Sequence, residues 1–116
     1  MLQNDFYDII AEQPSGYTLR LHAEHAIYAA HFPGHPITPG ACLIAIVEEL
    51  LCHRLRRPVH IVALTNVKFL MPLPPTAEPM FTFTDKNIDA CLVAISDNDN
   101  LYAKMSIRYV YPHSDL

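Results

Sequence analysis

The chain has 116 residues and a formal net charge of −4, which predicts a single domain with a modest core. Apolar residues make up 51% of the chain and charged residues 17%, so we expect a globular domain that hides further apolar surface in an oligomer. The negative charge argues against nucleic-acid binding, because phosphate contacts need a basic surface. The longest apolar run is far shorter than the ~20 residues that a membrane-spanning helix needs.

The first half of the chain predicts a helix, a strand and a loop. Residues 4–11 fit a short helix with an Asn or Asp cap and one apolar face. A Pro-Ser-Gly turn ends it, and the alternation of apolar and polar residues over 17–23 predicts a strand. Residues 24–30 are less regular and lead into a loop.

Residues 31–40 read His-Phe-Pro-Gly-His-Pro-Ile-Thr-Pro-Gly. Proline lacks an amide hydrogen and glycine leaves the backbone loose, so this run forms a shaped loop that presents a histidine beside the start of a helix. That helix spans residues 40–57. Its first two turns are apolar on every side, which indicates a buried helix.

The second half of the chain reads as strands. We expect them over residues 59–69, 79–86, 90–96 and 101–111, with a proline-rich connector at 71–75 and a hairpin turn at 97–100. One apolar helix with one sheet around it predicts an α+β fold. The whole chain, residues 1–116, then forms one domain.

Cysteine and histidine usage bears on compartment and metal binding. The cysteines Cys42, Cys52 and Cys91 form an odd set without paired spacing, which favours buried free thiols in a reducing compartment. Residues 1–8 contain acids and no basic run, unlike a signal peptide, so we expect a cytoplasmic protein. The histidines lack helical ligand spacing, and no Cys-x-x-Cys motif supports them. We therefore expect neither a metal nor a cofactor.

The motif His-Phe-Pro-Gly-x-Pro-x-x-Pro-Gly before a buried helix strongly resembles the hot-dog-fold dehydratases, which act on 3-hydroxyacyl chains carried on acyl carrier protein. Residues 31–40 match at every fixed position, and residues 67–75 look like the family's strand with its proline-bearing connector. The resemblance implies a hot-dog fold, in which an antiparallel sheet wraps around one long central helix. It also implies a dimer whose sheets join edge to edge, with active sites in the interface.

The resemblance implies a role for several residues of the motif. His31 matches the general base that removes a proton from the α-carbon of the substrate, a task suited to imidazole. Phe32, Gly34, Pro39 and Gly40 match the substrate-binding positions. Backbone N–H groups near Gly40 would polarise the thioester carbonyl. His35 occupies the variable position of the motif, where we expect a solvated side chain.

The resemblance also implies an acid, at position 45 of the partner subunit's central helix, which helps the β-hydroxyl to leave as water. This chain has Ala45 at that position. Glu48 and Glu49 follow on about the same helix face, one turn or ~5 Å further on. Three hypotheses remain: one of these glutamates is the acid, the acid is lost, or another chain in a mixed dimer supplies it. Alternatively, the two glutamates form a solvated or dimer-facing pair, with Glu49 bonding His53 four residues on.

We therefore expect dehydration of a 3-hydroxyacyl thioester, carried on acyl carrier protein or coenzyme A, to the trans-2-enoyl thioester in fatty-acid or related lipid or polyene biosynthesis. One alternative is a catalytically impaired hot-dog subunit, in a homodimer or heterodimer, that binds acyl chains or partners an active dehydratase. A weaker alternative is an acyl thioesterase. The basic group of Arg54, Arg56 and Arg57 suits either docking of an acidic carrier protein or complementation of the helix end.

Overall fold

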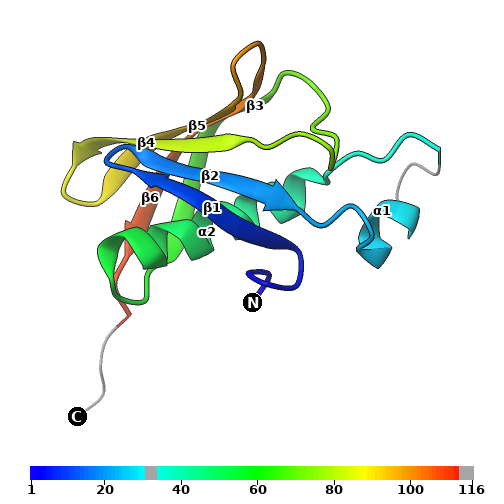
Figure 1. Cartoon of the computed structure of the whole chain (residues 1–116). Helices are drawn as coiled ribbons and strands as arrows, with labels where there is room; N and C mark the ends of the chain where they lie inside the picture. Colours follow the sequence, from blue (N-terminus) through cyan, green and yellow to red (C-terminus); the bar gives the residue numbers. More distant parts are fainter. Residues whose placement is uncertain (31–33, 113–116) are drawn as a thin grey trace.

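The computed structural model describes residues 1–30 and 34–112. Within these residues, six strands form a single antiparallel sheet, and two helices follow the second strand (Figure 1). The elements are, in chain order, β1 (Tyr7–Gln13), β2 (Gly16–Leu21), α1 (Ala26–Ala30), α2 (Gly40–Leu55), β3 (His60–Phe69), β4 (Met80–Asn87), β5 (Ala90–Ser96) and β6 (Leu101–Val110). No helix in this described part is long and apolar enough to cross a membrane.

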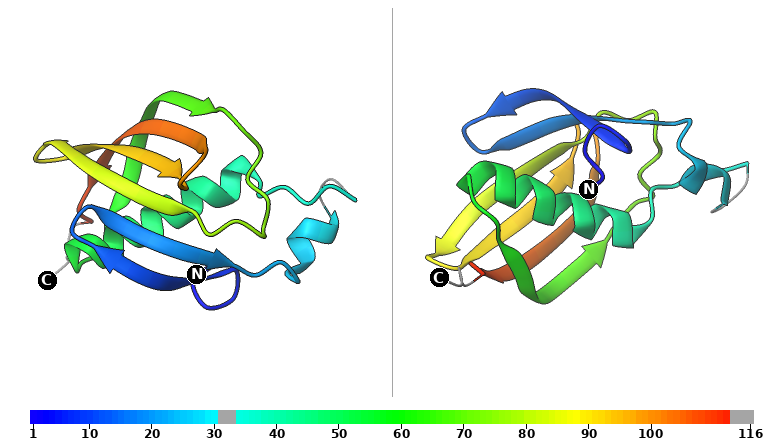
Figure 2. Two further views of the ribbon diagram at one scale, coloured as in Figure 1. Left: turned by 45° about the horizontal axis from the view of Figure 1, so that its top comes forward. Right: turned by 90° about the horizontal axis from the view of Figure 1, so that it is seen from below.

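The sheet has the strand order β1-β2-β4-β5-β6-β3. Its concave face curves around α2, which crosses the sheet as a central helix (Figure 2). The predicted α+β architecture, with an antiparallel sheet wrapped around one long helix, is therefore confirmed. Strands β1 and β3 form the two edges of the sheet.

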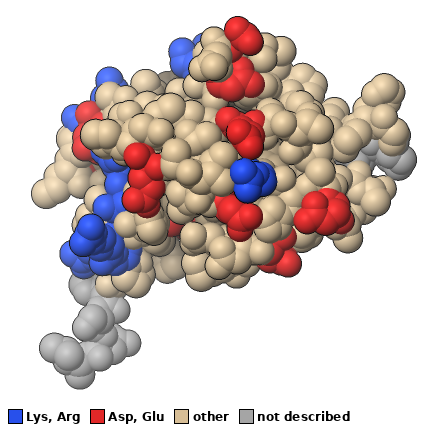
Figure 3. Space-filling view, viewed as in Figure 1, with Lys and Arg blue, Asp and Glu red and all other residues tan. Residues whose placement is uncertain are grey.

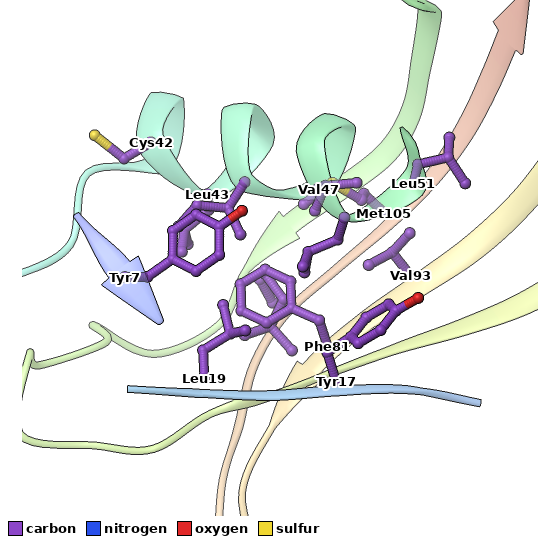
Figure 4. Packing of buried hydrophobic residues seen from close by; sticks show 14 of the residues in the cluster. Tyr7, Tyr17, Leu19, Cys42, Leu43, Val47, Leu51, Phe81, Val93 and Met105 are labelled. Carbon is purple, nitrogen blue, oxygen red and sulfur yellow. The ribbon is translucent and has the colours of Figure 1, made fainter. Parts of the chain in front are cut away.

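The core lies between α2 and the sheet. One face of α2 contributes the buried side chains, and Ile46 and Val47 are completely buried. They belong to one buried cluster with inward-facing sheet residues such as Leu19, Phe81 and Met105, and Figure 4 shows Val47 among these side chains. Each such aliphatic side chain contributes about 1.5–3 kcal/mol when fully buried. Burial of this face fixes the rotation of α2 about its axis.

The predicted helix at residues 4–11 is wrong. Tyr7 begins β1 and pairs with Leu21 of β2, and the ladder continues to Gln13 with a register shift between Ile9 and Ala11. Phe6 and Tyr7 are fully buried. Pairing with β2 satisfies the backbone and buries the apolar side chains, and this tertiary gain outweighs the local helical pattern.

Both helices differ from the prediction: α1 was not expected, and α2 ends earlier than expected. Residues 26–30, expected to be irregular, form α1. The long helix ends at Leu55 because Arg56 adopts the left-handed conformation with φ 57°. The N–H groups of Arg56 and Arg57 then turn back to the Cys52 carbonyl, as in a left-handed helix end. The predicted strands at 17–23, 59–69, 79–86, 90–96 and 101–111 all exist, with ends shifted by at most two residues.

Strand β3 is an irregular, apolar edge. It pairs with β6 on one side only, and its register shifts between Ile61 and Ala63 and again between Thr65 and Lys68. Asn66 sits in the second irregularity with φ 52°. Val62, Leu64 and Phe69 are exposed, which is unusual for apolar side chains on a free edge.

Candidate active site

A cavity of about 370 Å³ opens at the start of α2. The loop before α2 and the connector after β3 form its walls. Its lining comprises Ile37, Thr38, Pro39, Gly40, Leu43, Phe69, Leu70, Met71, Pro72 and Leu73. None of these residues is charged, so the cavity suits an apolar group. Pro39 and Gly40, which were predicted to bind substrate, both lie here.

Gly40 is the first residue of α2, so no preceding turn of the helix accepts a hydrogen bond from its N–H group. The ring of Phe69 covers the position where a side chain would stand: a Cβ built on Gly40 would lie 2.8 Å from the Phe69 Cζ atom. Glycine therefore allows the aromatic ring to approach the helix terminus. An N–H group in this place can polarise a carbonyl oxygen held against the helix.

A second cavity, of about 580 Å³, lies beside the first and shares Ile37 and Pro72 with it. Gly34 and His35 line it, and both are exposed. Gly34 adopts φ 84°, a conformation that favours glycine. The exposure of His35 agrees with its variable position in the motif. The predicted base His31 and the predicted substrate-binding Phe32 lie outside the described residues.

A buried hydrogen bond that sequence reasoning missed ties α1 to the cavity. The hydroxyl groups of Tyr28 and Thr38 lie 2.9 Å apart in a buried environment. Thr38 also donates its N–H to the Leu73 carbonyl at 2.8 Å, which joins the two walls of the cavity. Tyr28 stacks on Phe6 with ring centroids 5.4 Å apart. Burial raises the pKa of Tyr28, so its phenol stays neutral.

The Glu49 carboxylate holds the N-terminal segment against α2. Glu49 accepts hydrogen bonds from the N–H groups of Leu2 at 2.7 Å and Gln3 at 3.0 Å, and from the Tyr7 hydroxyl at 3.1 Å. Burial raises the pKa of Tyr7, and the neighbouring Glu49 charge raises it further. Tyr7 is therefore a permanent donor, and Glu49 acts as a structural acceptor in this arrangement.

Glu48 points to the other side of α2, toward β3. Its carboxylate accepts a hydrogen bond from the Ile61 N–H at 3.0 Å and lies 3.8 Å from the His60 ring. The predicted bond between Glu49 and His53 is not formed, because His53 pairs with Glu12 at 2.7 Å instead. Both glutamates thus bind backbone amides of segments that pack beside α2.

Ala45 is half-buried on the side of α2 between these two glutamates. Along the helix axis it lies about 7 Å from Gly40, whereas Glu48 and Glu49 lie about 12–14 Å away, at ~1.5 Å per residue. Cys42, near the helix start, is buried, and burial raises the pKa of its thiol. A protonated thiol is a poor nucleophile, so Cys42 serves the core.

Two remaining groups of polar side chains have structural partners. His22 bonds the Asp8 carboxylate at 2.8 Å and the Asp5 carbonyl at 2.9 Å through its two ring nitrogens. Both acceptors need a ring N–H, so this geometry favours the imidazolium. At the far end of α2, Arg54 donates to the Pro14 carbonyl at 3.0 Å. Among the described residues, no cluster of three or more metal-ligating side chains forms.

Solved structures of other proteins resemble this chain over nearly its whole length, although among curated proteins none matches it. A structure of the dehydratase heterocomplex ApeI:P from Xenorhabdus doucetiae matches with TM-score 0.74 and 22% identity, over 89% of this chain and 96% of the other. The TT0310 protein from Thermus thermophilus matches with TM-score 0.62 and 14% identity, over 96% of each chain.

The thioesterase HI1161 from Haemophilus influenzae also matches, with TM-score 0.54 and 14% identity, over 90% of this chain and 78% of the other. At these identities the similarity shows a shared fold, and the fold is the hot-dog fold that the motif predicts. The profile of the ApeI dehydratase family matches residues 10–106, which include the proline loop, α2 and most of the sheet. The chain belongs to the ApeI dehydratase family.

Proposed function

We propose that this chain is one half of a heterodimeric dehydratase that converts a 3-hydroxyacyl thioester, carried on acyl carrier protein, to the trans-2-enoyl thioester. The observation that carries the proposal is the pairing of an apolar cavity at the Gly40 amide with Ala45 on the adjacent helix face. The cavity suits an acyl thioester and its developing enolate. Alanine supplies no acid for the hydroxyl that must leave.

His31 takes the role of base in this proposal. It removes a proton from the α-carbon, the Gly40 N–H stabilises the charge that develops on the thioester oxygen, and a carboxylic acid protonates the departing β-hydroxyl. We assign that acid to a second hot-dog subunit, because Glu48 and Glu49 already bind backbone amides. A dehydratase heterocomplex of the same fold, ApeI:P, supports such an assembly.

The partner would join at the free edge of β3. Exposed apolar side chains at this edge, among them Val62, Leu64 and Phe69, gain burial when a second sheet continues the first. The same junction brings the central helix of the second subunit close to the Gly40 cavity, because Phe69 belongs both to β3 and to the cavity wall.

Installing the missing acid tests the proposal. We expect the purified wild-type chain alone to dehydrate a 3-hydroxyacyl thioester slowly or not at all, and Ala45→Glu to raise the rate at least ~100-fold, since general acid catalysis contributes about 10²–10⁴-fold. Adding His31→Ala to Ala45→Glu should abolish that gain. Full activity of the wild-type chain alone, lost in Glu48→Gln or Glu49→Gln, would instead identify a glutamate as the acid. Release of free thiol would indicate a thioesterase.

A further inference from the structure

The outer face of the sheet carries a pair of lysines directly opposite each other. Lys68 of β3 and Lys104 of β6 are partners in the antiparallel register, so their side chains share one face with Cβ atoms ~5 Å apart. Both residues are exposed. Among the described residues, no carboxylate lies within ion-pair distance of either ammonium group. Like charges in this position destabilise a sheet, and an external anion would relieve the repulsion.

The surrounding strands strengthen this positive region. Strands β3, β5 and β6 contain no Asp or Glu, although the whole chain has a net charge of −4. Arg108 lies on the same side of β6 as Lys104, and its guanidinium is 4.0 Å from Asp89. At the other end, Asp97 borders the region, with its carboxylate bonded to the Tyr102 hydroxyl. We call the surface formed by Lys68, Lys104 and Arg108 the lysine face.

Acidic side chains gather elsewhere on the molecule. Figure 3 shows many of them spread over the side that carries β1, β2 and β4, and basic side chains near the C-terminal end of α2. A negatively charged partner approaching the acidic side would be repelled and would be steered toward a basic region.

The lysine face adjoins the candidate active site. Lys68 directly precedes Phe69, whose ring covers Gly40. The cavity wall is also tied to β6, because the N–H groups of Leu70 and Met71 donate to the Tyr102 carbonyl at 2.8 and 3.2 Å. Tyr102 is two residues from Lys104. Lys68 and Lys104 thus lie at the ends of β3 and β6 that also carry the cavity wall.

The arginines at the end of α2 are less suitable for docking. The 16 residues of α2 place them about 24 Å from Gly40 along the helix axis. Arg54 already binds the Pro14 carbonyl, and Arg57 lies over the Tyr111 ring at 3.7 Å. These contacts favour complementation of the helix end over a docking role.

We propose that the lysine face is the docking surface for an acidic carrier domain that delivers the thioester to the cavity. The proposal rests on the proposed function, because it assumes that the substrate arrives on a carrier. Its support is charge complementarity beside the cavity, together with a lysine pair that has no ion-pair partner within residues 1–30 and 34–112. Such electrostatic contacts act on association rate and on KM, and salt weakens them.

The test compares one 3-hydroxyacyl chain on three carriers: an acyl carrier protein, coenzyme A and N-acetylcysteamine. It uses the chain alone or, if activity requires it, the complex with its partner subunit. For Lys68→Ser/Lys104→Ser we expect kcat/KM for the carrier-protein substrate to fall at least ~10-fold, through KM, at low salt. The kcat/KM for the N-acetylcysteamine thioester should not change. The matched control, Arg56→Ser/Arg57→Ser, removes two positive charges at the far end and should change neither value.

Other outcomes would overturn the docking surface. An equal loss of kcat/KM with the N-acetylcysteamine thioester would show that the lysines stabilise the fold or act in the cavity itself. An equal loss with coenzyme A would show that they bind a phosphate group of the substrate arm. A larger loss in the arginine variant would move docking to the helix end. Unfolding is controlled for, because removal of the lysine repulsion should keep or raise the melting temperature.

A binding measurement separates this proposal from the proposed function. If no thioester is dehydrated, fluorescence anisotropy of labelled, loaded acyl carrier protein still reports docking. Binding that weakens at least ~10-fold in the lysine variant, with unchanged binding in the arginine variant, would support the lysine face even though dehydration had failed. Equal binding of wild type and lysine variant would overturn it, whatever the activity.

Discussion

Replacing Glu49 with alanine should destabilise the fold well beyond what a surface substitution causes. Three donors lose their acceptor: the N–H groups of Leu2 and Gln3, and the Tyr7 hydroxyl. Tyr7 is completely buried, so its hydroxyl finds no water and costs about 1–3 kcal/mol when unpaired. The two amides are half-buried and regain water, at a few tenths of a kcal/mol each. We expect a total loss of about 2–3 kcal/mol.

Thermal unfolding followed by circular dichroism measures this loss. For 116 residues, an unfolding entropy of about 2.1 cal/mol/K per residue gives a shift of about 4 °C for each kcal/mol. Glu49→Ala should therefore lower the melting temperature by about 8–12 °C. The matched control is Glu48→Ala, which frees one backbone donor, the Ile61 N–H, and removes an exposed contact with His60; it should lower the melting temperature by about 2–4 °C.

A double-mutant cycle sharpens the result. Tyr7→Phe removes the buried hydroxyl, so Glu49→Ala should cost about 1 kcal/mol less in the Tyr7→Phe background than in the wild type. If Glu49→Ala lowers the melting temperature no more than Glu48→Ala, Glu49 does not hold the N-terminal segment, and a catalytic role for Glu49 regains support.

Three further predictions concern the cavity and the sheet edge. Gly40→Ala places a methyl group against the Phe69 ring. Because that ring is half-exposed and can move aside, we expect a melting temperature within about 4 °C of wild type. Turnover in a dehydration assay should fall at least ~10-fold, because the displaced ring belongs to the cavity wall. Tyr28→Phe leaves the buried Thr38 hydroxyl unpaired and should cost about 1–3 kcal/mol in urea unfolding, whereas adding Thr38→Val should recover about 1 kcal/mol; strictly additive losses would contradict the pairing. A hydrogen bond to the carboxylate on β1 raises the pKa of His22 above its ordinary 6.5, so its stabilisation is complete below that pH and is lost as pH rises through the folded-state pKa. Wild type and His22→Gln should therefore differ in melting temperature at pH 5.5 and converge by pH 9, and a constant difference would contradict the charged pair.

The elements that local patterns specify were predictable from the sequence. The apolar turns of α2, the alternation in β4 and β6 and the Asp-Asn-Asp-Asn turn are each encoded by neighbouring residues. Strand β1 could not be predicted in this way, because Phe6, Ile9 and Ile10 fit one face of a helix. Only pairing with β2 makes the extended form of this segment more stable than the helical form. Local pattern cannot weigh a ladder formed with a distant strand.

The sequence motif indicated where the candidate site lies, but the hydrogen bonds that hold the site together could not be predicted from it. Pro39 and Gly40 line the cavity, and their role in substrate binding stays a prediction of the motif. The partners of Glu49 are backbone amides 46 and 47 residues away, and backbone donors leave no trace in side-chain spacing. The Tyr28–Thr38 pair is ten residues apart across a proline-rich loop, a separation that only the folded chain converts into contact.

The irregularities of β3 bear on how the chain avoids uncontrolled assembly. A long, flat, apolar edge would offer a template on which any extended chain could add as a further strand, the first step toward fibrils. Two register shifts divide β3 into the short paired stretches 60–61, 63–65 and 68–69. Asn66 adopts a left-handed conformation between the last two, and irregularities of this kind bend a strand. A partner strand must therefore fit a short, bent segment of β3, so an arbitrary extended chain does not pair with this edge. Once one such partner is bound, no further strand is added to the sheet.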